Sequence, residues 1–279
     1  MKNILLPTDF SENSWNAITY ALQFFKETSC NFYLLHVNKI SELTIAGTSH
    51  GLDLEMVNGV NVKSTQAKLN QFLKRISCLP KNIKHQFFTQ SEYNSFIETI
   101  RNQVVEQHVD YIVMGTKGAS GIKKAILGSH TEDVITRVKC TMLVVPEKAT
   151  FKPIKNIAFP TDYSVYYKIE AFQPLLDILE QTSANLNMLH VSNKPKVLHK
   201  SQENNKQLLE NYFKSKKCNF HHIINRNVER AIEDFVVNKK VGLITLIAKN
   251  LNYFQQLFFH SKVEEASYHT ETPFLVIHE

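Results

Sequence analysis

Two periods of hydrophobic residues alternate along the chain. Short runs of apolar or β-branched residues are separated by longer segments in which apolar residues recur every three or four positions. The first period is typical of buried strands and the second of amphipathic helices. The segment after Ser11 shows the helical spacing in Trp15, Ile18, Ala21, Leu22 and Phe25.

This alternation predicts strands at about 2–7, 31–37, 83–89, 110–115 and 141–146, and helices near 12–27, 61–77, 94–108 and 130–138. Residues 38–60 form the least regular segment, which we expect to be a loop. The second half repeats the order, with strands at about 155–160, 185–191, 218–224, 242–248 and 273–278. Strands and helices in strict alternation predict a parallel sheet covered on both faces.

The chain is an internal repeat. Residues 2–11 (KNILLPTDFS) align with residues 155–164 (KNIAFPTDYS), and TMLVVP at 141–146 corresponds to PFLVIH at 273–278. A length of 279 residues also favours two domains over one. We therefore predict domains at 1–148 and 153–279, joined by a short polar link.

Composition narrows the function classes. The chain is 43% hydrophobic and 21% charged, with a net charge of +6 spread over many lysines. The absence of a long apolar run predicts no membrane span, and the absence of a basic stripe with aromatics predicts no nucleic-acid partner. The first residues lack a signal-peptide core, so we expect a cytoplasmic protein. The scattered cysteines are expected to be free, buried or half-buried thiols: Cys30, Cys78, Cys140 and Cys218.

Four of the eight glycines lie between residues 114 and 129: Gly115, Gly118, Gly121 and Gly128. Ligands of open parallel sheets bind beyond the carboxyl ends of the strands, where the loops after strands one and four meet. Glycine lets backbone N–H groups approach an anion without a Cβ, and Ser129–Glu132 reads as a capping box that starts a helix. The pattern indicates a phosphate site, and a glycine-rich turn before an ordinary helix is the alternative.

The loop has the spacing G-x2-G-x9-G-[ST]. Together with NILLPTDFS and the strand-end dipeptide HV, it closely resembles the universal stress protein family, in the tandem two-domain form common in bacteria and the ATP-binding branch. The resemblance covers nearly the whole chain. It implies an α/β fold of two tandem Rossmann-like (adenine-nucleotide alpha hydrolase-like) domains, each a five-stranded parallel sheet of order 3-2-1-4-5 with helices on both faces. Pairing through the last strand would form an intramolecular pseudo-dimer, and a homodimer of whole chains is compatible with it.

The resemblance also implies a site for ATP, or for ADP or AMP, with or without Mg²⁺. Asp9 would lie near the ribose or adenine, and Val37 would meet adenine through its backbone. Gly115 and Gly118 would hold the phosphates, and the start of the next helix would close the site. The implied set is Pro7, Thr8, Asp9, Val37, Met114, Gly115, Gly118, Gly128, Ser129, His130 and Thr131. Two of these have alternatives: Asp9 as a turn residue, and His130 as a polar residue at a helix start.

The second half replaces the glycines with Ala248, Leu251 and His260, so no binding residue is expected there. The leading hypothesis is a stress-response regulatory protein that binds one ATP and turns it over slowly or not at all. Two alternatives remain open. One is an interaction module that binds no nucleotide. The other is an ATP-dependent enzyme of the wider group, although the sequence contains neither an HxGH-like nor an SGGxDS-like signature.

Overall fold

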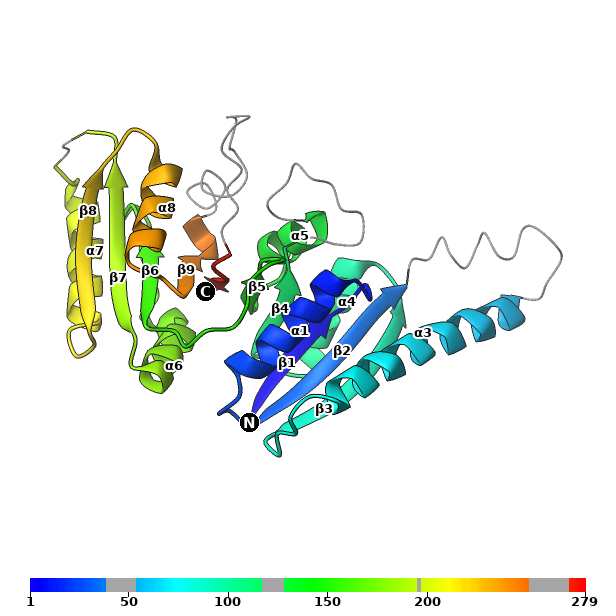
Figure 1. Cartoon of the computed structure of the whole chain (residues 1–279). Helices are drawn as coiled ribbons and strands as arrows, with labels where there is room; N and C mark the ends of the chain where they lie inside the picture. The colour runs from blue at the N-terminus through cyan, green and yellow to red at the C-terminus, as the bar shows by residue number, and fades with distance from the viewer. Residues whose placement is uncertain (39–53, 117–127, 195–196, 251–270) are drawn as a thin grey trace.

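The computed structural model describes residues 1–38, 54–116, 128–194, 197–250 and 271–279 (Figure 1). The N-terminal half contains β1 (Lys2–Pro7), α1 (Glu12–Phe24), β2 (Cys30–Asn38), α3 (Leu54–Ser77), β3 (His85–Tyr93), α4 (Phe96–Glu106), β4 (Tyr111–Gly115), α5 (Ser129–Arg137) and β5 (Thr141–Val145). The C-terminal half contains β6 (Asn156–Pro160), η1 (Ile169–Phe172), α6 (Gln173–Thr182), β7 (Asn185–Ser192), α7 (Lys200–Tyr212), β8 (Cys218–Ile224), α8 (Val228–Asn238), β9 (Leu243–Ile247), η2 (Ala248–Asn250) and β10 (Phe274–Ile277).

All ten of these strands form one sheet in the order β3-β2-β1-β4-β5-β10-β9-β6-β7-β8. Within each half the neighbouring strands are parallel, and the order is 3-2-1-4-5 when the strands are numbered from the start of that half. The halves join where β5 pairs antiparallel with β10. The α/β fold predicted from the alternation is therefore present, and the two halves pair through their last strands.

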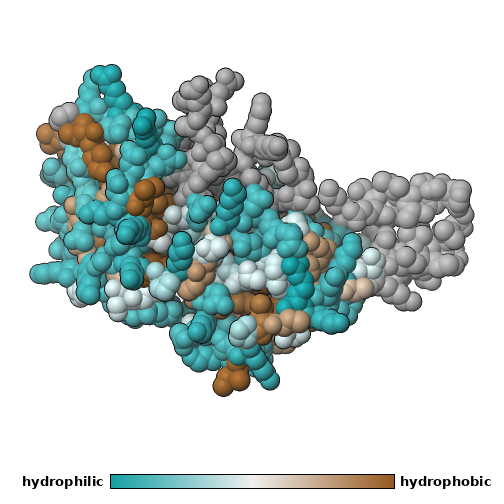
Figure 2. Space-filling view, viewed as in Figure 1, coloured by the Kyte–Doolittle hydropathy of each residue, from teal (hydrophilic) through white to brown (hydrophobic). Residues whose placement is uncertain are grey.

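Two apolar cores lie on opposite faces of the sheet. One contains buried residues of α1, α3, α6 and α7, and the other contains buried residues of α4, α5 and α8. Successive strand residues alternate between the cores, as Ile4, Leu5 and Leu6 of β1 do. Helices on both faces explain why every residue of β5, β9 and β10 is buried. The face shown in Figure 2 is mainly hydrophilic, with hydrophobic residues in small separate groups.

Two local expectations were wrong. The helix predicted from residue 61 begins at Leu54, so 54–60 are helical rather than part of a loop. Asn58 and Gly59 are poor helix formers, and their propensity is overridden within a long helix. The remainder of that expected loop, 39–53, lies outside the described residues. All four cysteines are free as expected, but Cys78 is exposed rather than buried or half-buried.

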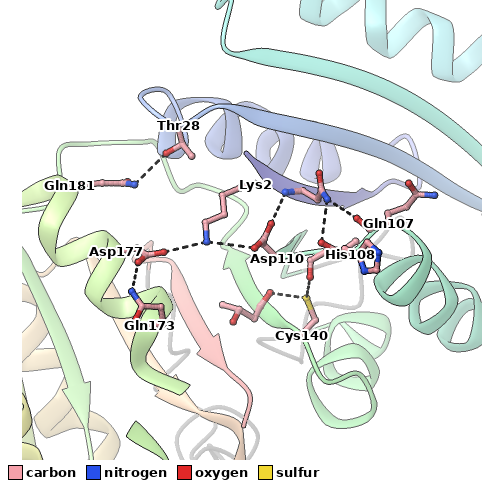
Figure 3. A network of polar contacts seen from close by, with 12 residues as sticks. Lys2, Thr28, Gln107, His108, Asp110, Cys140, Gln173, Asp177 and Gln181 are labelled. Carbon is pink, nitrogen blue, oxygen red and sulfur yellow. Dashed lines mark hydrogen bonds and ion pairs between the residues drawn. The ribbon is translucent and has the colours of Figure 1, made fainter. Parts of the chain in front are cut away.

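Polar contacts join the two halves beside the sheet (Figure 3). Lys2 Nζ lies 3.6 Å from a carboxylate oxygen of Asp110 and 3.3 Å from one of Asp177, which belongs to the other half. Gln181 of α6 donates to the Thr28 hydroxyl at 3.4 Å. One lysine therefore separates two carboxylates that would otherwise face each other across the junction.

We expect Lys2→Met to lower the free energy of unfolding by about 1 kcal/mol, the upper end for a partly exposed pair, because two carboxylates lose their shared cation. Urea denaturation at low and high salt measures this, and the loss should shrink as salt screens the charges. Lys84→Met is the matched control, since Lys84 pairs with Glu27 within one half. Equal, salt-independent effects of the two variants would contradict the role of Lys2.

Candidate functional site

A tight turn follows β1 and is held by the buried Thr8. Its N–H donates to the Leu35 carbonyl at 2.8 Å, which continues the pairing with β2. Its hydroxyl lies 2.9 Å from the Ser14 hydroxyl and accepts the Phe10 N–H at 3.0 Å. These bonds hold Phe10 at a φ of 63°, in the left-handed region that L-residues adopt only when the surroundings fix them.

Asp9 is exposed, and its Oδ1 accepts from both the N–H (3.1 Å) and the hydroxyl (2.5 Å) of Ser11. Ser11 in turn is the N-cap of α1. Asp162 makes the same pair of bonds to Ser164, at 3.0 and 2.7 Å, in the half that lacks the glycines. The turn interpretation of Asp9 is confirmed, and its contact with a nucleotide stays a prediction.

The histidine of the strand-end HV dipeptide supports this turn. His36 Nδ1 lies 2.7 Å from the Thr8 carbonyl, which can only accept, so the ring nitrogen donates. The His36 ring also stacks near Phe10, with centroids 4.4 Å apart. In the second half His190 makes the same bond to the Thr161 carbonyl, at 3.0 Å. This role of His36 was not predicted from the sequence, although the recurrence of HV at 36–37 and 190–191 was an available signal.

Gly115, the last residue of β4, faces Asn13 in the first turn of α1. A Cβ built on Gly115 would lie 2.5 Å from Asn13 Nδ2 and 2.8 Å from its Cγ, far inside contact distance. The glycine therefore permits α1 to pack against the end of β4. The repeat places Ala248 and Tyr166 at these two positions in the other half, and Tyr166 is 64% exposed. Asn13 was missed because this contact joins distant parts of the chain.

The two ends of the glycine loop are bonded to each other. The Gly128 N–H donates to the Thr116 carbonyl, and the Thr116 N–H donates to the Val145 carbonyl at 3.1 Å. The buried Thr131 hydroxyl donates to the Gly115 carbonyl at 2.8 Å. Together these bonds hold the start of α5 beside the carboxyl end of β4. Gly118 itself lies outside the described residues.

The start of α5 differs from the predicted capping box. The N-cap is Gly128 (φ −69°, ψ 150°), and Ser129 is the first helical residue, so the box is wrong. The first helical bond runs from the Glu132 N–H to the Gly128 carbonyl at 3.0 Å. The first N–H groups of a helix have no partner within the helix. Because glycine has no side chain, a glycine N-cap cannot accept a hydrogen bond from them. The exposed His130 has its ring centroid 4.5 Å from that of Phe96, which fits a residue packed at a helix start.

The predicted residues that the structure describes, which do not include Gly118, gather at one edge of the sheet. Pro7, Thr8 and Met114 are buried and Val37 is half-buried, at the carboxyl ends of their strands. Ser129 is exposed at the start of α5. Within the described ranges no group of three or more His, Cys, Asp or Glu side chains is arranged to hold a metal ion.

The sheet order reverses between β1 and β4, and the turn after β1 and the loop after β4 begin at that reversal. Ligand sites of doubly wound α/β proteins lie at this point. The sheet order and the position of the predicted residues therefore place the chain in the class of doubly wound α/β proteins. None of the helices in the described part of the chain is both long and apolar enough to cross a membrane.

Comparison with known proteins gives the family. The model of the universal stress protein family matches residues 1–146. Universal stress protein MJ0531 of Methanocaldococcus jannaschii is 28% identical over 144 residues, covering 52% of this chain and 81% of that protein. MJ0577 of the same organism is 28% identical over 160 residues, covering 53% of this chain and 96% of that protein.

The fold likeness extends further along the chain. The crystal structure of a universal stress protein from Archaeoglobus fulgidus aligns over 98% of this chain and 95% of that one, with a TM-score of 0.63 and 19% identity. The chain belongs to the universal stress protein family.

Proposed function

We propose that the chain is a universal-stress-type regulatory protein that binds one adenine nucleotide, ATP, in its N-terminal half. The nucleotide lies across the carboxyl ends of β1, β2 and β4, with its phosphates between the glycine loop and the first turn of α5. Adenine nucleotides are the ligand class that the resemblance of the glycine motif to the ATP-binding branch of the family implies.

One observation carries the proposal: the bond from the Gly128 N–H to the Thr116 carbonyl closes the glycine loop at its base. Closure keeps the first turn of α5, with its glycine N-cap, beside the carboxyl end of β4, next to which β1 lies in the sheet. N–H groups before the first intrahelical bond, together with the helix dipole, favour a phosphate there.

The C-terminal half supports a single site. At the position of Gly115 it has Ala248, which is buried. The next residue, Lys249, is bound to the Glu279 carboxylate at 2.9 Å, and that carboxylate also accepts the Lys168 N–H at 3.1 Å. The lysine at this position is therefore already paired with a carboxylate, and Ala248 adds a Cβ where the other half has none, so we assign no nucleotide to this half.

Calorimetric titration with ATP tests the stoichiometry. We expect one ATP per chain, and two equivalent sites or none would contradict the proposal. Mass spectrometry of small molecules released from the denatured protein identifies what it carries from the cell. An enzyme of the wider group would instead turn ATP over at about one per second or faster.

Gly128→Val tests the phosphate position. The variant keeps the N–H that bonds Thr116, and the extended φ and ψ of this residue accept valine, but the added branches occupy the space before the first turn. We expect ATP affinity to fall about tenfold or more, as for loss of a charge-assisted contact, and stability to fall by about 1 kcal/mol because valine is a poor N-cap. Ser95→Val, at the N-cap of α4, is the control and should leave binding unchanged. Unchanged affinity in Gly128→Val would remove the phosphates from this place.

A further inference from the structure

The C-terminal half contains a small cavity on the sheet face covered by α7. Its volume is about 120 Å³, and it is lined by Tyr163, His190, Leu198, Lys206, Phe220, His221 and His222. Tyr163 follows the end of β6, His190 lies within β7, and Lys206 comes from α7. His222 is exposed, so the cavity has an open side. A space of this size suits a ligand of a few heavy atoms rather than a nucleotide.

The hydrogen bonds of His190 and His222 determine which nitrogen of each ring is left to contact a ligand. His190 Nδ1 donates to the Thr161 carbonyl at 3.0 Å, which leaves Nε2. The Ser192 hydroxyl donates to the Lys194 carbonyl at 2.9 Å, so it accepts from His222 Nε2 at 2.8 Å, which leaves Nδ1. The two rings lie 5.1 Å apart between centroids. Each ring has one nitrogen that becomes a donor when the ring takes up a proton.

The charges around His190 disfavour that proton while the cavity is empty. Burial is the largest effect and lowers the pKa of His190, although the hydrogen bond to the Thr161 carbonyl opposes it. His222 and Lys206 lower the pKa by smaller amounts, and Asp162 raises it. Lys206 lies 3.5 Å from Glu210, but both side chains are about two-fifths exposed, so this pair neutralises the lysine weakly. An anion in the cavity would reverse the balance by pairing with both Lys206 and a protonated imidazole.

We propose that this cavity binds one small oxyanion, a carboxylate or phosphate group, together with a proton. Tyr163, Phe220 and Leu198 exclude water from one side of the anion, and Lys206 and the His190–His222 pair supply its donors. The paired histidines distinguish this half, because strand register pairs His36 with Ser91 in the other half and His190 with His222 here. Two neutral imidazoles also suit a divalent metal, but the lysine charge opposes one.

The histidine ring signals in NMR spectra of the full chain test the proposal. Each signal is assigned from a His→Gln variant, and sodium acetate or inorganic phosphate is titrated against sodium chloride at constant ionic strength. Acetate is the decisive probe, since a carboxylate is ionised at both about pH 6 and about pH 7.5. We expect acetate to shift the His190 and His222 signals and to bind at least about threefold more tightly at the lower pH, as proton uptake requires.

Lys206→Met should weaken this binding about tenfold, as expected for one charged hydrogen-bond donor. Lys200→Met, on the same helix but outside the cavity, should leave binding unchanged. The proposal is overturned if neither anion shifts the two signals, if Lys206→Met binds like the parent, or if affinity is the same at both pH values. It is also overturned if Zn²⁺ shifts the signals and the anions do not. The ring signals report on this cavity alone, so the outcome is independent of nucleotide binding in the other half.

Discussion

Gly115→Ala should lower the free energy of unfolding by about 1–3 kcal/mol, as overpacking does in a closely packed site. The new Cβ would lie 2.5 Å from Asn13 Nδ2, so the side chain of Asn13, in the first turn of α1, must move. Because the turn after β1 is bonded to that helix through Ser14, we also expect ATP affinity to fall about tenfold or more. Urea denaturation and calorimetric titration measure the two effects.

Gly242→Ala is the matched control. A Cβ there would meet the Ile154 backbone at 3.4 Å, an ordinary contact, so the free energy of unfolding should change by less than about 1 kcal/mol. Asn13→Ala removes the clashing side chain, so the double variant with Gly115→Ala should be more stable than the sum of the two single changes predicts. Strict additivity would show that Gly115 is required for some other reason.

Acid should destabilise the fold through His278, which directly follows β10. Its Nε2 is buried without a hydrogen-bond partner among the described residues. Burial, with a contribution from Lys139, lowers the pKa of His278 to about 4 from an ordinary value of 6.5. Between these values the unfolded chain binds a proton that the folded chain does not, so stability falls as pH falls through this window. The size is about 1–3 kcal/mol after allowance for partial exposure.

His278→Gln tests this prediction by unfolding in urea at several pH values between about 4 and 7. The variant should lose part of the decline in stability at acid pH. Some decline remains because the pKa values of His190 and His221 are also lowered by burial. His108→Gln, at an exposed position, should keep the full decline. If the parent and His278→Gln showed the same dependence of stability on pH, His278 would be excluded as the cause.

The fold could be predicted from the sequence because the helices and strands of each half follow from local patterns of hydrophobic residues. The predicted apolar runs overlap the observed strands. The repeated segments KNI and PTD align the strands of the second half with those of the first. Strand order and pairing through β5 and β10 came from the family resemblance rather than from the residues. Local pattern failed at Leu54 and Ser129, where helix length and backbone angles, rather than residue type, decide where a helix begins.

The candidate site was predictable only in outline. Which loops border it follows from the position of the first and fourth strands. The roles of Asn13 and His36 could not be predicted from local sequence. Asn13 contacts Gly115 and His36 binds the Thr8 carbonyl, and both partners are brought near only by the tertiary fold. The same limit applies to His190 and His222, which become neighbours only when β7 and β8 pair in register.

The single sheet can be completed only after its last strand, β10, has been synthesised. β5 (TMLVV) is fully buried and mostly apolar, and it pairs on one side with β10, the last strand of the second half to be synthesised. Until then the nascent first half carries an unpaired hydrophobic edge, the kind of surface on which chains aggregate. Chaperone binding to newly made chains should therefore persist after β9 has been synthesised and end when Phe274–Ile277 pairs with β5.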